Sequence, residues 1–144
     1  MPIANYSTTV TAMKSLGEIQ GMLVSHGAKA IMTNFTNCGE PESLAFIVTT
    51  QFGDVPYKLP ANVERVQAVL NRQRIRKEIP RDMAVRVAWR IVKDWVRAQM
   101  AILETEMVSI EQIFLPYMTN NSGETLYQIM AGNRLALPEE GTRE

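Results

Sequence analysis

Four cations at helical spacing are the residues with the clearest chemical potential. They recur every three or four positions in the middle of the chain: Arg86, Arg90, Lys93 and Arg97. At about 100° per residue they fall within an arc of about 60° on one side of a helix, which we call the basic stripe. Like charges at these spacings repel, at a cost of a few tenths of a kcal/mol per pair. The sequence therefore predicts that an anionic group neutralises the stripe.

Four more cations precede the stripe in a segment without an apolar pattern: Arg72, Arg74, Arg76 and Lys77. All eight side chains are candidates for binding the phosphates of single-stranded DNA or RNA, with the linker cations gripping the backbone and the stripe forming a groove floor. In one alternative the chain neutralises itself, with Asp94 pairing with Arg90 or Arg97 and the acidic C-terminal segment covering the stripe. In another, the acidic surface of a protein partner or of a neighbouring subunit binds there.

Charge is segregated along the chain although the total is zero. Residues 64–97 contain ten basic and four acidic side chains, a net charge of +6. Residues 98–144 contain two basic and seven acidic side chains, a net charge of −5. The middle segment is suited to a polyanion, and the acidic segment is what self-neutralisation would require.

Residues that could carry catalysis are few. His26 and Cys38 are the only histidine and cysteine. Cys38 therefore has no second histidine to activate it, and no Ser/His/Asp set can be assembled. His26 precedes Gly27 at a predicted helix end, where the helix dipole favours a cation. Glycine-rich phosphate loops are absent, and the glutamates of residues 104–111 lack metal-ligand spacing. We predict a non-enzymatic protein with no catalytic residue, metal site or cofactor.

The elements that position these cations predict an α+β fold. Apolar residues at helical spacing predict a helix over Thr11–His26 that Gly27 ends. Strands rich in β-branched and aromatic residues follow at 30–35, 43–51 and 55–59, joined by turn-forming residues. A second helix begins after Pro60. Residues 11–73 are therefore predicted to form an α-β-β-β-α unit with a three-stranded antiparallel sheet.

The second half of the chain is predicted to be helical and part of the same single domain, residues 1–144. We expect a basic linker at 74–80, a segment 81–107 with one long central helix from about Arg81 to Glu104, short helices over 108–137 and a frayed tail at 138–144. Apolar residues fill about 200° of the long helix, which predicts a buried helix with one wet, basic edge. Trp95 lies opposite the stripe and Trp89 on its shoulder, which favours core packing over stacking on bases. Ser109 and Gln112 predict a capping box.

An apolar run beyond the long helix is the candidate for contact with a partner or a second copy of the chain: Phe114, Leu115, Tyr117 and Met118. The alternative is that these side chains cap the core of their own domain. Nine methionines suit an adaptable interface.

The compartment is predicted from what the sequence lacks. One cysteine cannot form an internal disulfide, the first ten residues do not have the pattern of a secretory signal, and the longest apolar stretch contains five charges. We expect a cytoplasmic protein without membrane contact.

The α-β-β-β-α order of residues 11–73 resembles the double-stranded-RNA-binding domain, a fold that reads duplex shape and phosphates. The resemblance is one of topology. That family has a Lys-Lys-x-Ala-Lys cluster where its second helix begins, and the matching stretch here is Pro60-Ala61-Asn62-Val63-Glu64-Arg65. No binding residue is therefore transferred to this chain.

A second resemblance covers most of the chain. It rests on residues 2–6 (PIANY), 17–20 (GEIQ), 87–96 (VAWRIVKDWV) and 114–117 (FLPY). These segments resemble a family of small hypothetical proteins of phages, prophages and related mobile elements. The resemblance implies a setting, in which accessory proteins handle phage DNA or block a host defence component. The predicted function is a non-enzymatic accessory protein that binds nucleic acid; the alternative is an anti-defence inhibitor that binds a host immune protein or sequesters a nucleotide signal.

Overall fold

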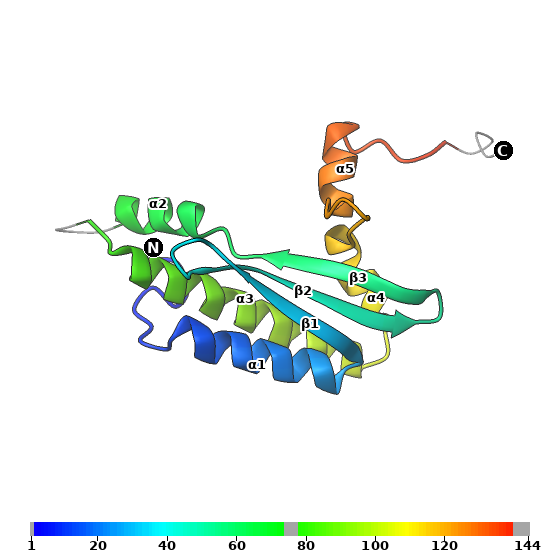
Figure 1. Cartoon of the computed structure of the whole chain (residues 1–144), viewed down its shortest axis with the longest axis horizontal. Coiled ribbons are helices and arrows are strands. Elements are labelled where there is room, and N and C mark those ends of the chain that lie inside the picture. The colour runs from blue at the N-terminus through cyan, green and yellow to red at the C-terminus, as the bar shows by residue number, and fades with distance from the viewer. Residues whose placement is uncertain (1, 74–77, 140–144) are drawn as a thin grey trace.

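A computed structural model describes residues 2–73 and 78–139 and confirms the α+β fold (Figure 1). One helix precedes a three-stranded sheet, and a long helix and short C-terminal helices follow it. The elements are α1 (Ala12–Ser25), β1 (Ala28–Phe35), β2 (Pro41–Thr50), β3 (Gly53–Pro60), α2 (Val63–Gln73), α3 (Arg81–Glu104), α4 (Ile110–Phe114), η1 (Leu115–Tyr117) and α5 (Leu126–Gly132).

Local signals set the ends of α1 and the hairpins. The Thr11 hydroxyl caps α1 by accepting a hydrogen bond from the Lys14 amide at 3.2 Å. Gly27 follows the helix with φ +108°, a conformation that a side chain disfavours. Gly39 and Gly53 have φ +84° and +97° in the two connections between the strands. The sheet is antiparallel throughout, in the order β1-β2-β3.

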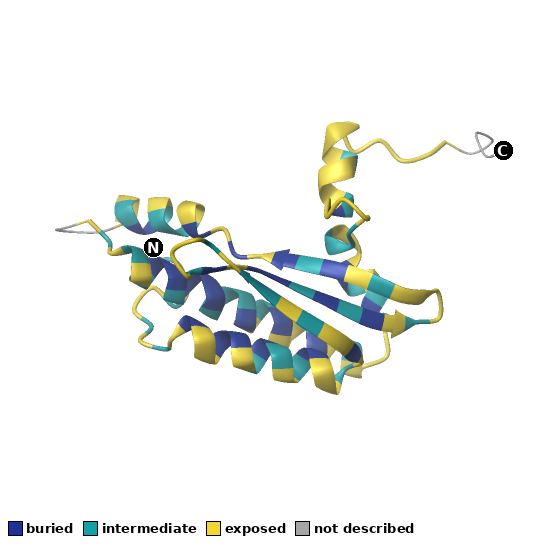
Figure 2. Cartoon of the chain, in the orientation of Figure 1, coloured by how far each residue is buried: buried dark blue, intermediate teal, exposed yellow. Residues whose placement is uncertain are grey.

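One face of the sheet carries most of the core. Leu44, Phe46 and Val48 of β2 and Tyr57 and Leu59 of β3 are buried and belong to the same apolar cluster as α1 and α3. Successive residues of a strand point to opposite faces. The other face, which we call the outer face, is therefore formed by the residues between these, and Figure 2 shows exposed and half-buried positions alternating with the buried ones.

The long helix α3 packs against both α1 and α2 and ends at Glu104, as predicted. It stops there because Glu106 adopts φ +63° and the Thr105 hydroxyl donates to the Ile102 carbonyl. Trp89 is fully buried, and half-buried Trp95 packs edge-on against Phe114 and Tyr117. Both tryptophans are therefore core residues, as the helical wheel predicted.

The C-terminal part begins with the predicted capping box. The Ser109 hydroxyl accepts from the Gln112 amide, and the Gln112 side chain accepts from the Ser109 amide. Pro116 lies in η1, and the chain then runs beside β3, where the Thr119 amide donates to the Pro56 carbonyl at 3.0 Å. From there α5 stands away from the rest of the molecule (Figure 1). Part of the predicted frayed tail, residues 140–144, lies outside the described residues.

None of the helices within residues 2–73 and 78–139 is both long enough and apolar enough to cross a bilayer.

Candidate anion-binding site

The basic stripe of α3 faces α1 and the N-terminal segment rather than open solvent. Lys93 is only 4% exposed, and the side chains of Arg90 and Arg86 are 16% and 29% exposed. Arg97, nearer the end of the helix, is exposed. The expectation of a wet edge was therefore wrong for Lys93 and Arg90, because α1 packs along this side of α3.

Glu18 of α1 neutralises the centre of the stripe. One of its oxygens, Oε2, lies 3.2 Å from Arg90 Nη1 and 3.9 Å from Lys93 Nζ. Arg90 Nη1 is also 3.4 Å from the hydroxyl of Ser15, which is fully buried. The compensating anion is thus a residue of another helix of the same chain. The sequence signal was the placement of Ser15 and Glu18 three residues apart on the border of the apolar face of α1.

Asp94 neutralises Lys93 from the same helix. Its carboxylate lies 2.6 Å from Lys93 Nζ and accepts a hydrogen bond from the Asn5 side chain at 2.7 Å. Arg90 or Arg97 was the predicted partner of Asp94, but the structure pairs Asp94 with the adjacent residue, Lys93. Asn5 ties the N-terminal segment to α3 at this point, so the segment also shields the stripe.

Arg86 is held in a similar way at the other end. Its Nη1 donates to Asp82 at 2.7 Å across one helical turn, and its Nε lies 3.5 Å from the Thr8 carbonyl oxygen. Three cations of the stripe therefore have carboxylate partners within the chain. Self-neutralisation comes from Glu18, Asp82 and Asp94, whereas the acidic C-terminal segment leads away from α3 up to residue 139 (Figure 1).

Acid should weaken this pairing. Hydrogen bonds from Lys93 and then Asn5 hold the pKa of Asp94 below its ordinary value of 3.8. A carboxyl with a lowered pKa in the folded state contributes stability above its unfolded pKa, and the contribution is lost as the pH falls through the folded value. We expect the melting temperature to drop below about pH 4 and Asp94→Asn to make that drop shallower. Thermal melts of both proteins from pH 7 downwards test this, and parallel curves would contradict it.

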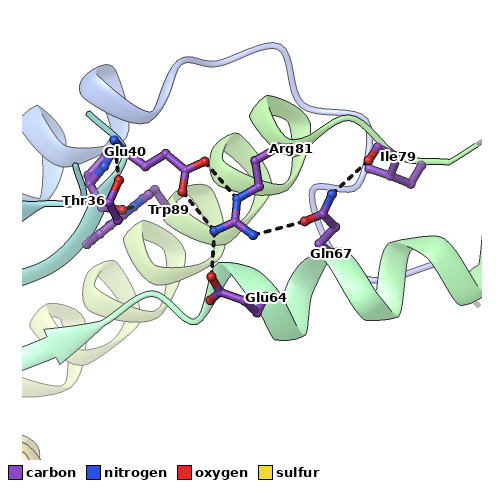
Figure 3. Close-up of polar contacts among 8 residues, drawn as sticks. Thr36, Glu40, Glu64, Gln67, Ile79, Arg81 and Trp89 are labelled. Atoms are coloured by element: carbon purple, nitrogen blue, oxygen red, sulfur yellow. Dashed lines mark hydrogen bonds and ion pairs between the residues drawn. The ribbon is translucent and has the colours of Figure 1, made fainter. Parts of the chain in front are cut away.

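Arg81, the first residue of α3, joins three parts of the fold (Figure 3). Its guanidinium binds both oxygens of Glu40, from the β1 to β2 connection, at 2.9 Å, and donates to Glu64 of α2 at 2.8 Å. Gln67 of α2 accepts a fourth hydrogen bond at 3.1 Å. These carboxylates, Glu40 foremost, raise the pKa of Arg81. Sequence reasoning did not single out Arg81, because its partners are 41 and 17 residues away.

Hydrogen bonds also join the two ends of the connection between α2 and α3. The Asn71 side chain accepts from the Ile79 amide at 2.8 Å. The Gln67 side chain donates to the Ile79 carbonyl at 3.1 Å (Figure 3). The ends are therefore fixed next to each other. Of the linker cations, Arg72 is described and exposed, whereas Arg74, Arg76 and Lys77 lie outside the described residues.

Two arginines of α2 differ from the stripe in their surroundings. Arg65 and Arg72 are exposed, and neither forms a salt bridge within the part of the chain that the structure describes. Uncompensated positive charge is thus found on α2 and at the start of the connection, and not at the centre of α3. Exposed cations of this kind can exchange counterions for phosphates.

The predicted contact residues after α3 differ in their burial. Phe114 is fully buried and packs against Phe46, Tyr57 and Trp95. A side chain without exposed surface is not available to a partner, so Phe114 caps its own core. Tyr117 and Met118 are half-buried, and Leu115 is 45% exposed.

His26 and Cys38 lie in different parts of the fold, at the C-terminal end of α1 and in the β1 to β2 turn. His26 Nε2 is 3.2 Å from Glu104, and its Nδ1 is 2.8 Å from the Met22 carbonyl oxygen, which places it as a helix-end contact between α1 and α3. Cys38 is exposed in the β1 to β2 turn. In residues 2–73 and 78–139, no three His, Cys, Asp or Glu side chains are grouped so that they could hold a metal ion.

Comparison with known proteins gave no match: no protein-family model, no curated protein and no solved structure matches this chain.

Proposed function

We propose that this chain is a non-enzymatic accessory protein of a phage or mobile element that binds single-stranded DNA or RNA, chiefly through the cations at the α2 to α3 connection. The observation that carries the proposal is the contrast between the two basic groups. The stripe is compensated by Glu18, Asp82 and Asp94, whereas Arg65 and Arg72 are exposed without a carboxylate partner among the described residues. The sequence adds three more cations directly after them.

The charge and the anchoring of this region support the proposal. Residues 65–77 contain five basic side chains and no acidic one. Phosphate binding by exposed cations needs no base-specific groove, and its affinity comes from counterion release. The hydrogen bonds of Asn71 and Gln67 to Ile79 hold the two ends of the connection next to each other. Arg81 joins these ends to Glu40, between β1 and β2. The resemblance to small phage and prophage proteins supplies the proposed setting.

The same contrast gives the stripe a different role. Arg86, Arg90 and Lys93 hold α1 and the N-terminal segment on α3, and Arg97 is the member that is open to solvent. We assign phosphate binding to the connection and to α2, with Arg97 outside the main contact.

A matched pair of triple variants tests this assignment. Arg72→Ser, Arg74→Ser and Arg76→Ser together remove three cations of the connection. Lys14→Ser, Lys58→Ser and Arg97→Ser remove three cations elsewhere, which have no salt bridge within the described residues. Binding to a labelled single-stranded oligonucleotide is measured by fluorescence anisotropy at two salt concentrations.

We expect the connection variant to bind at least tenfold more weakly and the control to bind nearly as the natural chain does. For single strands the slope of log affinity against log salt falls by about 0.7 per lost phosphate contact, so it should fall by about 2. Equal losses in both variants would remove the assignment to the connection. An absence of binding by the natural chain at low salt would overturn the proposal and favour a protein or nucleotide ligand.

A further inference from the structure

The outer face of the sheet is apolar at its centre. It presents Ala30 and Met32 of β1, Ala45 and Ile47 of β2, and Pro56 of β3, which are neighbours in the strand register. These side chains border a shallow hollow of about 290 Å³, and Met32 is 59% exposed. The open face of an antiparallel sheet is normally polar, since it is solvated. An exposed apolar face of this kind indicates a contact surface.

A second unpaired apolar surface lies at the other end of the chain. We call residues 126–139 the C-terminal arm; it consists of α5 and the segment after it. Within α5 no residue is buried. Large apolar side chains are exposed along the whole arm: Tyr127 at 57%, Ile129 at 43%, Leu135 at 57% and Leu137 at 77%. Figure 2 shows the arm as exposed almost throughout. An isolated helix of seven residues is unstable in water, so packing must come from elsewhere.

The root of the arm directs it away from its own sheet. The Thr119 amide donates to Pro56 of β3, and the Leu126 amide donates to the Met118 carbonyl at 2.7 Å. Thr119 and Thr125 form an antiparallel bridge around the turn between them, and Thr125 caps α5. These bonds fix where α5 begins and aim it outward (Figure 1). Thr119 itself borders the hollow, so the arm leaves the molecule at the rim of the apolar face.

We propose that the arm packs across the outer face of a second copy of this chain, and that the second copy returns its own arm. Because arm and face belong to one chain and the arm begins at the rim of the face, a two-fold arrangement satisfies both surfaces in both copies. Each copy then contributes both its arm and its face, so the arm-to-face contact is made twice toward the roughly 800 Å² per partner of an ordinary stable interface. This inference does not depend on nucleic-acid binding.

Two methionines of similar exposure provide a matched test. Met32 on the outer face is 59% exposed, and Met13 on α1, in the helical layer, is 62% exposed. Sedimentation equilibrium of the full chain should give twice the chain mass of 16.2 kDa. Met32→Lys should weaken the dimer at least tenfold, and Leu137→Lys in the arm should do the same, because a lysine in an apolar contact is desolvated. Met13→Lys should leave the dimer unchanged.

Circular dichroism melts of the three variants establish that each is folded, which the exposure of all three positions leads us to expect. A chain that stays at 16.2 kDa up to high micromolar concentration would overturn the proposal and leave the arm to its own sheet or to another protein. Equal effects of Met32→Lys and Met13→Lys would overturn it too. So would a dimer that Leu137→Lys does not weaken, since the arm would then lie outside the contact.

Discussion

Glu18→Gln is expected to lower the free energy of unfolding by about 3 kcal/mol, because removal of one partner from a largely buried ion pair leaves the other charge uncompensated. Here two cations lose their shared carboxylate. Lys93 is 4% exposed and retains Asp94, whereas Arg90 retains only the Ser15 hydroxyl as a hydrogen-bond partner among the described residues. The amide of glutamine has nearly the shape of the carboxylate, so the packing of α1 on α3 is otherwise kept.

Glu104→Gln is the matched control for this change. Glu104 makes one contact across the same pair of helices, to His26, but its side chain is 68% exposed. Exposed pairs of this kind contribute less than about 1 kcal/mol. Urea unfolding of both variants at neutral pH gives the two values. Losses of similar size would contradict the structural role of Glu18.

A double variant separates the ionic effect from other consequences of changing α1. Glu18→Leu with Arg90→Met removes the central anion together with the cation that has no other carboxylate partner among the described residues. Buried ion pairs replaced by apolar side chains often retain or regain stability. We expect the double variant to recover more than half of the loss caused by Glu18→Leu alone. No recovery would mean that the loss comes from helix packing rather than from unpaired charge.

Trp89→Ala is expected to cost about 4 kcal/mol, the range for the removal of a fully buried large aromatic side chain. Trp89 is 0% exposed and its indole Nε1 donates to the Pro41 carbonyl at 3.0 Å, which joins α3 to the first residue of β2 (Figure 3). The substitution therefore creates a cavity and leaves a buried carbonyl oxygen unpaired. Both effects reduce the stability of the contact between α3 and the sheet.

Trp95→Ala and Trp89→Phe divide this loss into its parts. Trp95 is half-buried, and no side-chain hydrogen bond is found for it within the described residues, so its removal should cost less than half as much. Trp89→Phe keeps most of the volume and loses the hydrogen bond, with an expected cost of about 2 kcal/mol. Chemical unfolding followed by circular dichroism avoids dependence on tryptophan fluorescence. A larger loss for Trp95→Ala than for Trp89→Ala would contradict the assignment of Trp89 as the central core residue.

The basic residues differ in how much they contribute to folding. Arg90 and Lys93 fasten α1 to α3, so their replacement changes folding and binding together. Arg65 and Arg72 are exposed and have no salt bridge within the described residues, so their replacement should leave the melting temperature nearly unchanged. Loss of binding without loss of stability therefore distinguishes a contact with nucleic acid from a structural role.

The sequence alone determined the order of the elements and the fold class, since local signals specify these. Apolar periodicity gave α1 and α3, β-branched runs gave the strands, and Gly27 and the Ser109 capping box fixed helix ends that the structure confirms. The bounds of α3, Arg81 and Glu104, also agree with its apolar pattern, whereas the left-handed conformation of Glu106 was not predicted, because this residue type rarely adopts it.

Only the tertiary structure decided what the basic stripe contacts and where the C-terminal arm points. A helical wheel gives the direction of Arg90 and Lys93 around their own axis, but not which helix packs there or which of its residues is level with them. Glu18 lies more than 70 residues from both, and its pairing follows from the packing of α1 on α3. The direction of α5 likewise depends on the bonds of residues 118 and 119 to neighbours that are distant in sequence or lie across a turn. Such pairings are set by the three-dimensional packing of elements, which a local pattern does not contain.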